Sequence, residues 1–196
     1  MRSLPALFLA FSAFLIPAAH AQYAVYGTAS LTGYGFNDGN GNTAFKKDSG
    51  GPTGGVFYNF PIQSRLSAGI DARATYSPGN NGGTAELVGL RIGFVPHKVR
   101  LRPYFQIGGG VVSSSEQQTV YHYSPTGAYT GYTLQSTRYT SGAAEILFGL
   151  DVRLTDSFDL RALEWGAAAG ASSVNSPSVA FVNTGVVYHF PSRGRK

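Results

Sequence analysis

The sequence predicts an all-β fold, an eight-stranded antiparallel up-and-down transmembrane β-barrel. Apolar and polar residues alternate with a period of two in several segments, and long and short connections separate these segments in turn. Gly (26), Tyr (12) and Phe (13) are abundant, and charged residues are only 13% of the chain. That charge fraction is about half the share usual in soluble domains. A wall that faces lipid would have this composition.

The first 21 residues are expected to be a cleaved signal peptide. Arg2 supplies a positive start, an apolar stretch from Leu4 to Ile16 follows, and Ala19-His20-Ala21 has the small-x-small pattern of a signal-peptidase site. The apolar stretch is shorter than the roughly 20 residues that a membrane-spanning helix needs. We therefore divide the chain into a signal peptide (1–21), an outer-membrane β-barrel domain (22–190) and a basic C-terminal tail (191–196).

Eight strands account for the alternation in residues 22–190. The segment 137–153 shows it most clearly, because Ile146, Phe148 and Leu150 fall on one face while Glu145 and Asp151 fall on the other. Each strand has about the length that crosses a bilayer core when tilted. The expected spans are 23–35, 53–60, 65–76, 84–95, 101–113, 137–153, 158–170 and 178–190.

The connections fall into two classes. Long ones, rich in Gly, Asn, Ser and Thr, are expected at 36–52, 77–83, 114–136 and 171–177, and short ones at 61–64, 96–100 and 154–157. Long loops at one end and tight turns at the other are typical of outer-membrane barrels. Since an even number of strands brings both ends of the chain to one side, the short turns and both termini are expected in the periplasm.

The strand at 158–170 breaks strict alternation. Alternation from Phe158 would turn Glu164 toward lipid, whereas a β-bulge near Ala162-Leu163 would return both Arg161 and Glu164 to the interior. We therefore predict a bulge there. With this bulge, Trp165 faces lipid, while Tyr76, Phe94, Tyr188 and Phe190 near strand ends would form aromatic girdles.

The final strand carries a family resemblance. It ends Val186-Val187-Tyr188-His189-Phe190, and this aromatic ending after eight alternating strands resembles the small OmpA-like outer-membrane β-barrel proteins, the eight-stranded outer membrane protein beta-barrel domain family. The resemblance implies that Val186, Tyr188 and Phe190 face outward and serve as the signal read by the barrel assembly machinery. It departs from the family at Pro191 to Lys196, which follow the Phe.

Charged residues on the polar faces are expected to meet in the lumen. An eight-stranded barrel is only wide enough to be filled by side chains, so such charges must pair with one another. We therefore predict an interior salt-bridge network rather than an ion path, with a narrow or gated porin-like channel as the alternative. Its members are Asp71, Arg73, Arg91, Arg102, Glu145, Asp151, Arg161 and Glu164.

An enzyme is the second alternative, because some barrels hydrolyse lipid A or phospholipids. His122-Tyr123-Ser124 has the spacing of a His-x-Ser motif, and Glu116 or Glu145 would supply the acid of a hydrolytic triad. Pro125-Thr126-Gly127 follow at once and place the motif in a loop instead of on a strand wall. We therefore expect no enzyme activity and no catalytic residues.

The sequence contains no pattern that predicts a metal, a cofactor or a nucleic acid as ligand. There is no cysteine, and His97 and His189 have no partners at metal-ligand spacing, so we expect no metal and no cofactor. The formal net charge is +5, and the Lys and Arg are scattered along the chain apart from Arg193-Gly194-Arg195-Lys196 at its end. Nucleic-acid binding would need a contiguous basic stripe with stacking aromatics, so no nucleic acid is expected.

The sequence thus predicts a structural or surface-contact protein of the Gram-negative cell envelope. Its partners would be outer-membrane lipids, the assembly machinery and a ligand of the loop 114–136, where Tyr121, Tyr123, Tyr129, Tyr132 and Tyr139 gather among Ser and Thr. A soluble periplasmic lipocalin-like carrier is the remaining alternative. It would turn the apolar faces inward around a ligand and leave the charges outside.

Overall fold

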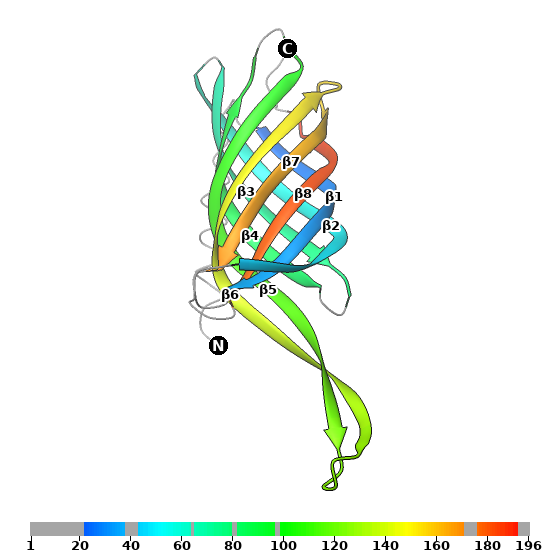
Figure 1. The fold of residues 1–196 in the computed structure, drawn as a ribbon. Coiled ribbons are helices and arrows are strands. Elements are labelled where there is room, and N and C mark those ends of the chain that lie inside the picture. Colours follow the sequence, from blue (N-terminus) through cyan, green and yellow to red (C-terminus); the bar gives the residue numbers. More distant parts are fainter. Residues whose placement is uncertain are drawn as a thin grey trace, which may run out of the picture.

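Eight antiparallel strands close into a barrel in the computed structural model of the chain (Figure 1). The structure describes residues 22–37, 43–63, 65–79, 82–96, 99–170 and 176–191. The expected signal peptide, His97 and the tail residues 192–196 lie outside these ranges. The strands are β1 (Gln22–Asn37), β2 (Thr43–Gln63), β3 (Leu66–Ser77), β4 (Gly83–Phe94), β5 (Leu101–Tyr123), β6 (Tyr129–Arg153), β7 (Phe158–Gly170) and β8 (Pro177–His189).

Each strand pairs with the next along the chain, and β1 pairs with β8 to complete the ring, which confirms the predicted up-and-down topology. Ala24 at the start of β1 lies beside His189 at the end of β8, so both strand ends lie at one end of the barrel. That end, which also carries the connections after β2, β4 and β6, is called the turn end below. The opposite end is called the loop end.

Two predicted loops are wrong, because strands extend into them. The segment 36–52 is mostly strand, since β2 begins at Thr43 and pairs with β1 from there on. The segment 114–136 is a β-hairpin: β5 and β6 stay paired as far as Tyr123 and Tyr129. Hydrophobic alternation did not indicate these extensions, because neither segment has an apolar face to bury.

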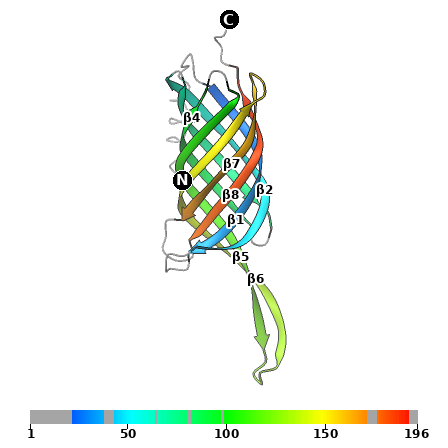
Figure 2. The same ribbon diagram turned by 45° about the horizontal axis from the view of Figure 1, so that its top comes forward.

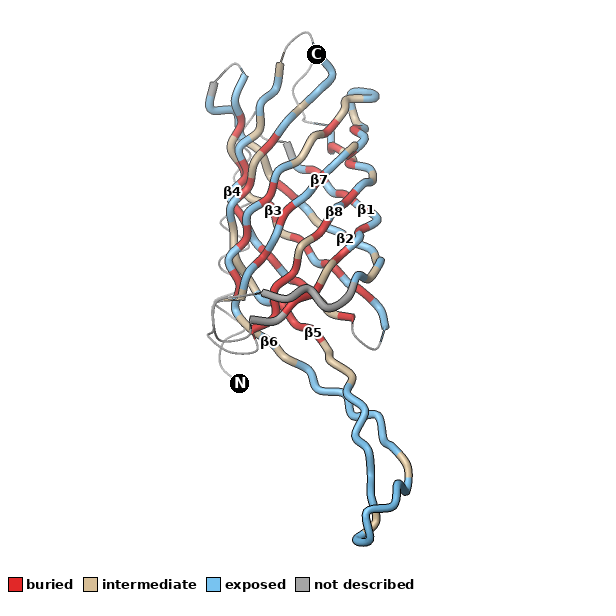
Figure 3. Tube along the Cα trace, in the orientation of Figure 1, coloured by how far each residue is buried: buried red, intermediate tan, exposed pale blue. Residues whose placement is uncertain are grey.

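The alternation on the barrel wall is oriented with the apolar side outward. Val88, Leu90 and Ile92 of β4 are each more than half exposed, while Leu87, Gly89 and Arg91, which alternate with them, are buried. The same pattern runs round the ring, and Figure 3 shows buried and exposed residues alternating along the strands. This orientation is the reverse of a carrier barrel, which would hold its apolar faces inside. Among the described residues, no helix is long and apolar enough to span a membrane.

Aromatic residues gather on the outer wall near the turn end. Tyr188 contacts both Phe158 and Phe190, with ring centroids 5.0 and 5.1 Å apart, and Tyr23 lies 4.7 Å from Tyr58. Such a belt suits the boundary between lipid and water, where one side of each ring is apolar and the other wet. Trp165 also faces outward, where it stacks on Phe148 at 5.1 Å.

Candidate functional site: a lumen of paired charges and a projecting ribbon

The register of β7 explains how both of its central charges face the lumen. Pairing with β8 skips from Arg161 to Glu164, and pairing with β6 shifts at the same place. The predicted bulge is therefore confirmed. Because the bulge adds one residue to the strand, Arg161 and Glu164, three apart, both point inward and are buried.

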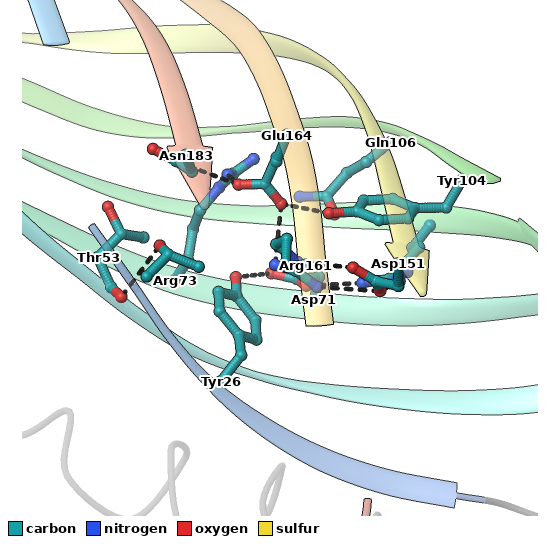
Figure 4. A network of polar contacts seen from close by, with 12 residues as sticks. Tyr26, Thr53, Asp71, Arg73, Tyr104, Gln106, Asp151, Arg161, Glu164 and Asn183 are labelled. Atoms are coloured by element: carbon teal, nitrogen blue, oxygen red, sulfur yellow. Dashed lines mark hydrogen bonds and ion pairs between the residues drawn. The ribbon is translucent and has the colours of Figure 1, made fainter. Parts of the chain in front are cut away.

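Arg161 lies at the centre of the interior network (Figure 4). Its guanidinium donates to both carboxylate oxygens of Asp151, at 3.0 and 3.5 Å, and to Glu164 at 2.9 Å. It also lies over the ring of Tyr26, 4.1 Å from the centroid. A planar fork with a fixed charge suits such a position, because it satisfies two carboxylates at once.

Glu164 is the most heavily bonded acceptor in this network. Besides Arg161, it accepts hydrogen bonds from Arg73 at 2.9 Å, Tyr104 at 2.5 Å and Asn183 at 2.5 Å. Arg73 also donates to Glu145, its second carboxylate. These bonds join strands on opposite sides of the ring, so the network ties the wall together across the lumen.

Arg91 completes the centre of the barrel. It donates to Asp151 at 2.7 Å, and its second nitrogen lies 3.8 Å from Asp71. Its guanidinium lies between two rings, 4.2 Å from the centroid of Phe57 and 3.5 Å from that of Tyr104. Stacking on two aromatic faces replaces part of the hydration that this buried cation has lost.

Arg102 is placed differently from the other predicted network members. Its side chain is 23% exposed and pairs with Asp159 at 2.8 Å, nearer the turn end. His189 also contacts Asp159, at 2.9 Å, and is buried on the inner side of the wall. The structure thus brings seven of the eight predicted charges into one network and puts Arg102 into a second, smaller cluster.

The loop half of the lumen is filled differently. Val112, Leu147 and Val179 are fully buried there, within an apolar cluster that also contains Phe181 and Leu87. Beside it, hydroxyl groups of β1, β2 and β3 are hydrogen bonded in a chain, with Thr53 bonded to Ser30 and Thr75 at 2.5 and 2.7 Å. Above the charge network, the interior is therefore occupied by packed side chains.

Beyond the ring, β5 and β6 continue as a two-stranded ribbon. The pairing of β5 with β4 ends at Ser114, and that of β6 with β7 ends at Ala143, so Ser115–Tyr123 is paired with β6 alone. Nine residues of strand span about 30 Å. Figures 1 and 2 show the ribbon projecting from the loop end of the barrel, and Figure 3 shows it exposed along most of its length.

The register sorts the ribbon into two unlike faces. Tyr121 lies opposite Tyr132, Tyr123 opposite Tyr129, and Thr119 opposite Leu134, so these side chains share one face. The four tyrosines and Leu134 are each more than half exposed. The rings of Tyr121 and Tyr123 lie 6.3 and 6.0 Å from that of Tyr129. The opposite face carries Gln118, Val120, His122, Thr133 and Gln135.

The His-x-Ser motif lies at the tip of the ribbon. His122 Nε2 forms a hydrogen bond with Thr133 Oγ1 at 2.9 Å, while Ser124 bonds with Thr126 and accepts from the amide of Ala128. Glu145, one of the two candidate acids, lies inside the barrel on Arg73. His122 and Ser124 are thus bonded to other partners than a triad would give them. Among the described residues, no group of three His, Asp or Glu is placed to hold a metal ion.

Comparison with known structures identifies the fold. Neisserial surface protein A, NspA, superposes with a TM-score of 0.52 at 14% identity, over 87% of this chain and 99% of that protein. The chain shares the fold of NspA. The attachment invasion locus protein Ail of Yersinia pestis gives a TM-score of 0.48 at 14% identity, over 87% of this chain and 97% of that protein. OprG of Pseudomonas aeruginosa gives 0.40 at 10%, with coverages of 87% and 96%.

Comparisons of sequence give no family for the chain: no protein-family model matches it, and neither does any curated protein. At the identity found with NspA, the likeness establishes the fold alone. The role of the chain therefore has to be argued from its own lumen, wall and ribbon.

Sequence reasoning missed several members of the interior clusters. Asp159 lies two residues before Arg161 and so on the same face of β7, which was a usable signal. Tyr104 gave the same signal, because it lies two residues after Arg102, whereas Tyr26 and Asn183 are on strands that contain no Asp, Glu, Lys or Arg. Their bonds to Asp71 and Glu164 depend on how the strands are staggered around the ring.

Proposed function

We propose that the chain is a non-enzymatic, integral protein of the bacterial outer membrane. In this proposal a sealed barrel holds the β5–β6 ribbon outside the cell, where the ribbon contacts another surface. One observation carries the proposal: the barrel has an apolar outer wall, and an uncharged tyrosine face projects beyond its loop end. The turn end and both termini would then lie in the periplasm.

The membrane location is supported by what the wall exposes. Leu31, Val56, Leu90 and Ile107 are each more than half exposed on a closed ring of strands. In water such a band would far exceed the apolar patches that soluble monomers tolerate, whereas in lipid it costs nothing. Closure of the ring leaves no unpaired strand edge within this band.

Membrane fractionation and gel electrophoresis test this location. We expect the protein in the outer-membrane fraction, with a mobility that changes on boiling because the folded barrel resists detergent at room temperature. A protein found in the soluble fraction with the same mobility before and after boiling would contradict the proposal.

The contact role is supported by the chemistry of the ribbon. Tyr side chains offer large rigid rings with a polar tip, which gives contact area at a small cost in conformational entropy. Between Ser115 and Arg138, only Glu116 and Arg138 carry full charges. We therefore propose that contact rests on ring burial and hydrogen bonds, and that it survives high salt.

Replacing the tyrosine face tests the contact. Tyr121, Tyr123, Tyr129 and Tyr132 are changed together to Ser, and the matched control changes Gln118, Val120, Thr133 and Gln135 on the opposite face to Ser. In a non-adherent Gram-negative strain, the unaltered protein and the control are expected to promote cell sedimentation and retention on epithelial monolayers, while the tyrosine variant does not. Equal behaviour of all three proteins would contradict the contact role.

The lumen is proposed to be closed to ions. A conducting path would have to separate several buried ion pairs and displace Leu147 and Val112, both fully buried. Planar-bilayer recordings are expected to show no steady conductance, and a steady open channel would contradict this part of the proposal.

The hydrolase alternative is tested by a substitution at the ribbon tip. Ser124→Ala is expected to leave the lipid A profile of the cells unchanged, and an altered profile would favour a hydrolase.

A further inference from the structure

One edge of the ribbon has no neighbouring strand. The amide of Ser115 donates to the carbonyl of Gly82 at 2.9 Å, and beyond this bond no described strand pairs with that side of β5. Glu116 to Tyr123 pair only with β6, on their other side, and Figures 1 and 2 show the ribbon clear of the barrel. This segment, called the β5 edge below, therefore presents a row of backbone N–H and C=O groups to water.

The β5 edge lacks the features that prevent an exposed edge from accepting another strand. Natural proteins block such edges with Lys, Pro or a bulge. The β5 edge contains no Lys, Arg, Pro or Gly, and its pairing with β6 is regular from Glu116 to His122. The outer edge of β6 is different, because Gly131 has a φ of 142° and Arg138 carries a charge. Addition of a strand is therefore favoured on β5.

The residues of the β5 edge are complementary to the same edge of a second copy. In an antiparallel pair centred on Thr119, opposite residues share a face of the sheet. Glu116 of each copy then lies opposite His122 of the other, and Gln118 lies opposite Val120. Centring the pair on Gln118 would place Glu116 opposite Val120, and centring it on Val120 would place Glu116 beyond the edge. The pair centred on Thr119 therefore gives the charged residue a hydrogen-bonding partner.

His122 is suited to this contact. Its Nε2 forms a hydrogen bond with Thr133 Oγ1 at 2.9 Å within the ribbon. When the Thr133 hydroxyl donates, the imidazole carries its hydrogen on Nδ1, which is then the donor for the Glu116 carboxylate of a second copy. His122 is exposed and lies on the face opposite the tyrosines. The contact would therefore leave the tyrosine face open.

We propose that the β5 edge pairs with the β5 edge of a second copy of this chain in a facing membrane. This inference rests on the proposed function, because it names a partner for the ribbon. The two ribbons form one sheet in the order β6–β5–β5–β6, with a two-fold axis at Thr119. Since the paired strands are antiparallel, the two barrels lie at opposite ends of this sheet and belong to different cells. The overlap from Glu116 to His122 provides roughly six to eight backbone hydrogen bonds.

Cysteine cross-linking tests the register. Thr119 lies opposite its own copy, so Thr119→Cys is expected to give a disulfide-linked dimer on mild oxidation of the cells, because opposite Cβ atoms in such a sheet are about 5 Å apart. Ser136→Cys is the matched control, since Ser136 is exposed on the same face of the ribbon but belongs to β6. Equal yields of dimer from the two variants, or none from Thr119→Cys, would overturn the proposal.

Changes at the two ends of the overlap test whether the partner is a second copy. Glu116→Lys removes the acceptor and His122→Glu opposes two carboxylates, so cells carrying either variant alone are expected to cluster less than cells with the unaltered protein. In a mixture of the two populations, every carboxylate meets a cation or an imidazole, and clustering is expected to return. A mixture that clusters no better than its components would overturn the proposal. An unchanged mobility shift on boiling verifies that both variants are folded.

Phosphatidylcholine vesicles separate a second copy from a foreign partner. Vesicles that carry this protein alone are expected to cluster with one another and not with protein-free vesicles, as measured by light scattering. If they do not cluster, the ribbon has a partner of another kind and the proposal is overturned. Clustering with protein-free vesicles would indicate lipid binding and would overturn it as well.

The same variants distinguish failure of this inference from failure of the proposed contact role. Glu116→Lys and His122→Glu leave the tyrosine face intact, so retention on epithelial monolayers is expected to persist while clustering of cells is lost. If both variants cluster as the unaltered protein does and only the fourfold tyrosine variant loses retention, the contact role stands and the pairing of two copies is overturned.

Discussion

The strands β5 and β6 differ sharply between their barrel part and their ribbon part. Inside the ring each has a second neighbour, and the inward side chains of Tyr104, Glu145 and Leu147 are buried. Beyond Ser114 and Ala143 the same two strands pair only with each other, and tyrosines are exposed. The difference teaches that closure of the ring, rather than strand pairing as such, provides the burial that stabilises this fold.

The same contrast separates two sets of positions. Stability depends on the interior of the barrel, whereas residues of the ribbon are available for contact with another surface. Interior charges are paired across the lumen, so each substitution there leaves a partner unsatisfied. Ribbon side chains contact few neighbours, so substitutions there change the surface at little cost to the fold. Four predictions test this contrast, from the largest expected loss of stability to none.

Removing the central cation should have the largest effect. Arg161→Met leaves Asp151 and Glu164 each without one buried partner, and we expect the free energy of unfolding to fall by about 3–5 kcal/mol. The control is Arg153→Met, which breaks an exposed pair with Asp156 and should cost less than about 1 kcal/mol. Urea unfolding in detergent micelles measures both. Equal losses would show that the interior network does not stabilise the barrel.

A charge on the outer wall should lower the free energy of unfolding somewhat less than loss of the central cation. Leu90 lies midway along β4 and is 61% exposed, so Leu90→Arg would place a guanidinium in the lipid. We expect a loss of about 2–4 kcal/mol in a bilayer. Leu90→Ala serves as the control for lost side-chain volume. If Arg at this position is tolerated better than Ala, the wall does not face lipid.

A methyl group added to an interior glycine should lower the free energy of unfolding less than either of these changes. The Tyr104 ring lies directly over Gly149, and a Cβ there would overlap it. Gly149→Ala should therefore displace Tyr104 from Glu164 and lower stability by about 1–3 kcal/mol. Gly27→Ala on β1 is the matched control, because a Cβ there meets no atom within 4 Å. The two variants are compared by the temperature at which the folded band disappears from the gel.

Changing the ribbon tyrosines should not alter stability. The fourfold Tyr→Ser variant described above alters only exposed positions outside the ring, so its free energy of unfolding should stay within about 0.5 kcal/mol of the original. The measurement is the same urea titration. A loss as large as that of Gly149→Ala would mean that the ribbon packs on the barrel and is not a free contact surface.

The sequence predicted the barrel part of the strands better than the parts beyond the ring. Alternation located the barrel part of all eight strands, and the spacing of Arg161 and Glu164 located the bulge, because the outer wall and the lumen of the ring have opposite polarities. Beyond the closed ring that constraint ends, so the strand segments at 43–52, 115–123 and 129–136 had no hydrophobic signal. In 115–136 the content of Thr and Tyr, residues that favour strands, was the remaining indication, whereas 43–52 has a single Thr and no Tyr.

Pairing within the lumen was only partly predictable. Charges on inward faces had to find partners, and seven of the predicted eight share one network. Which charges meet depends on strand stagger, which alternation does not specify. For that reason Arg102 pairs with Asp159 near the turn end instead of joining Asp151, although Asp151 lies beside it in the strand register.

The orientation of the barrel tests the central proposal most directly. Because the chain contains no cysteine, single Cys substitutions can be labelled in intact cells with a membrane-impermeant maleimide. Ala128→Cys at the ribbon tip and Asp156→Cys at the turn end are both exposed positions. We predict that Ala128→Cys is labelled in intact cells and Asp156→Cys only after the outer membrane is permeabilised. Labelling of Asp156→Cys alone in intact cells, or of both sites equally, would contradict the proposal.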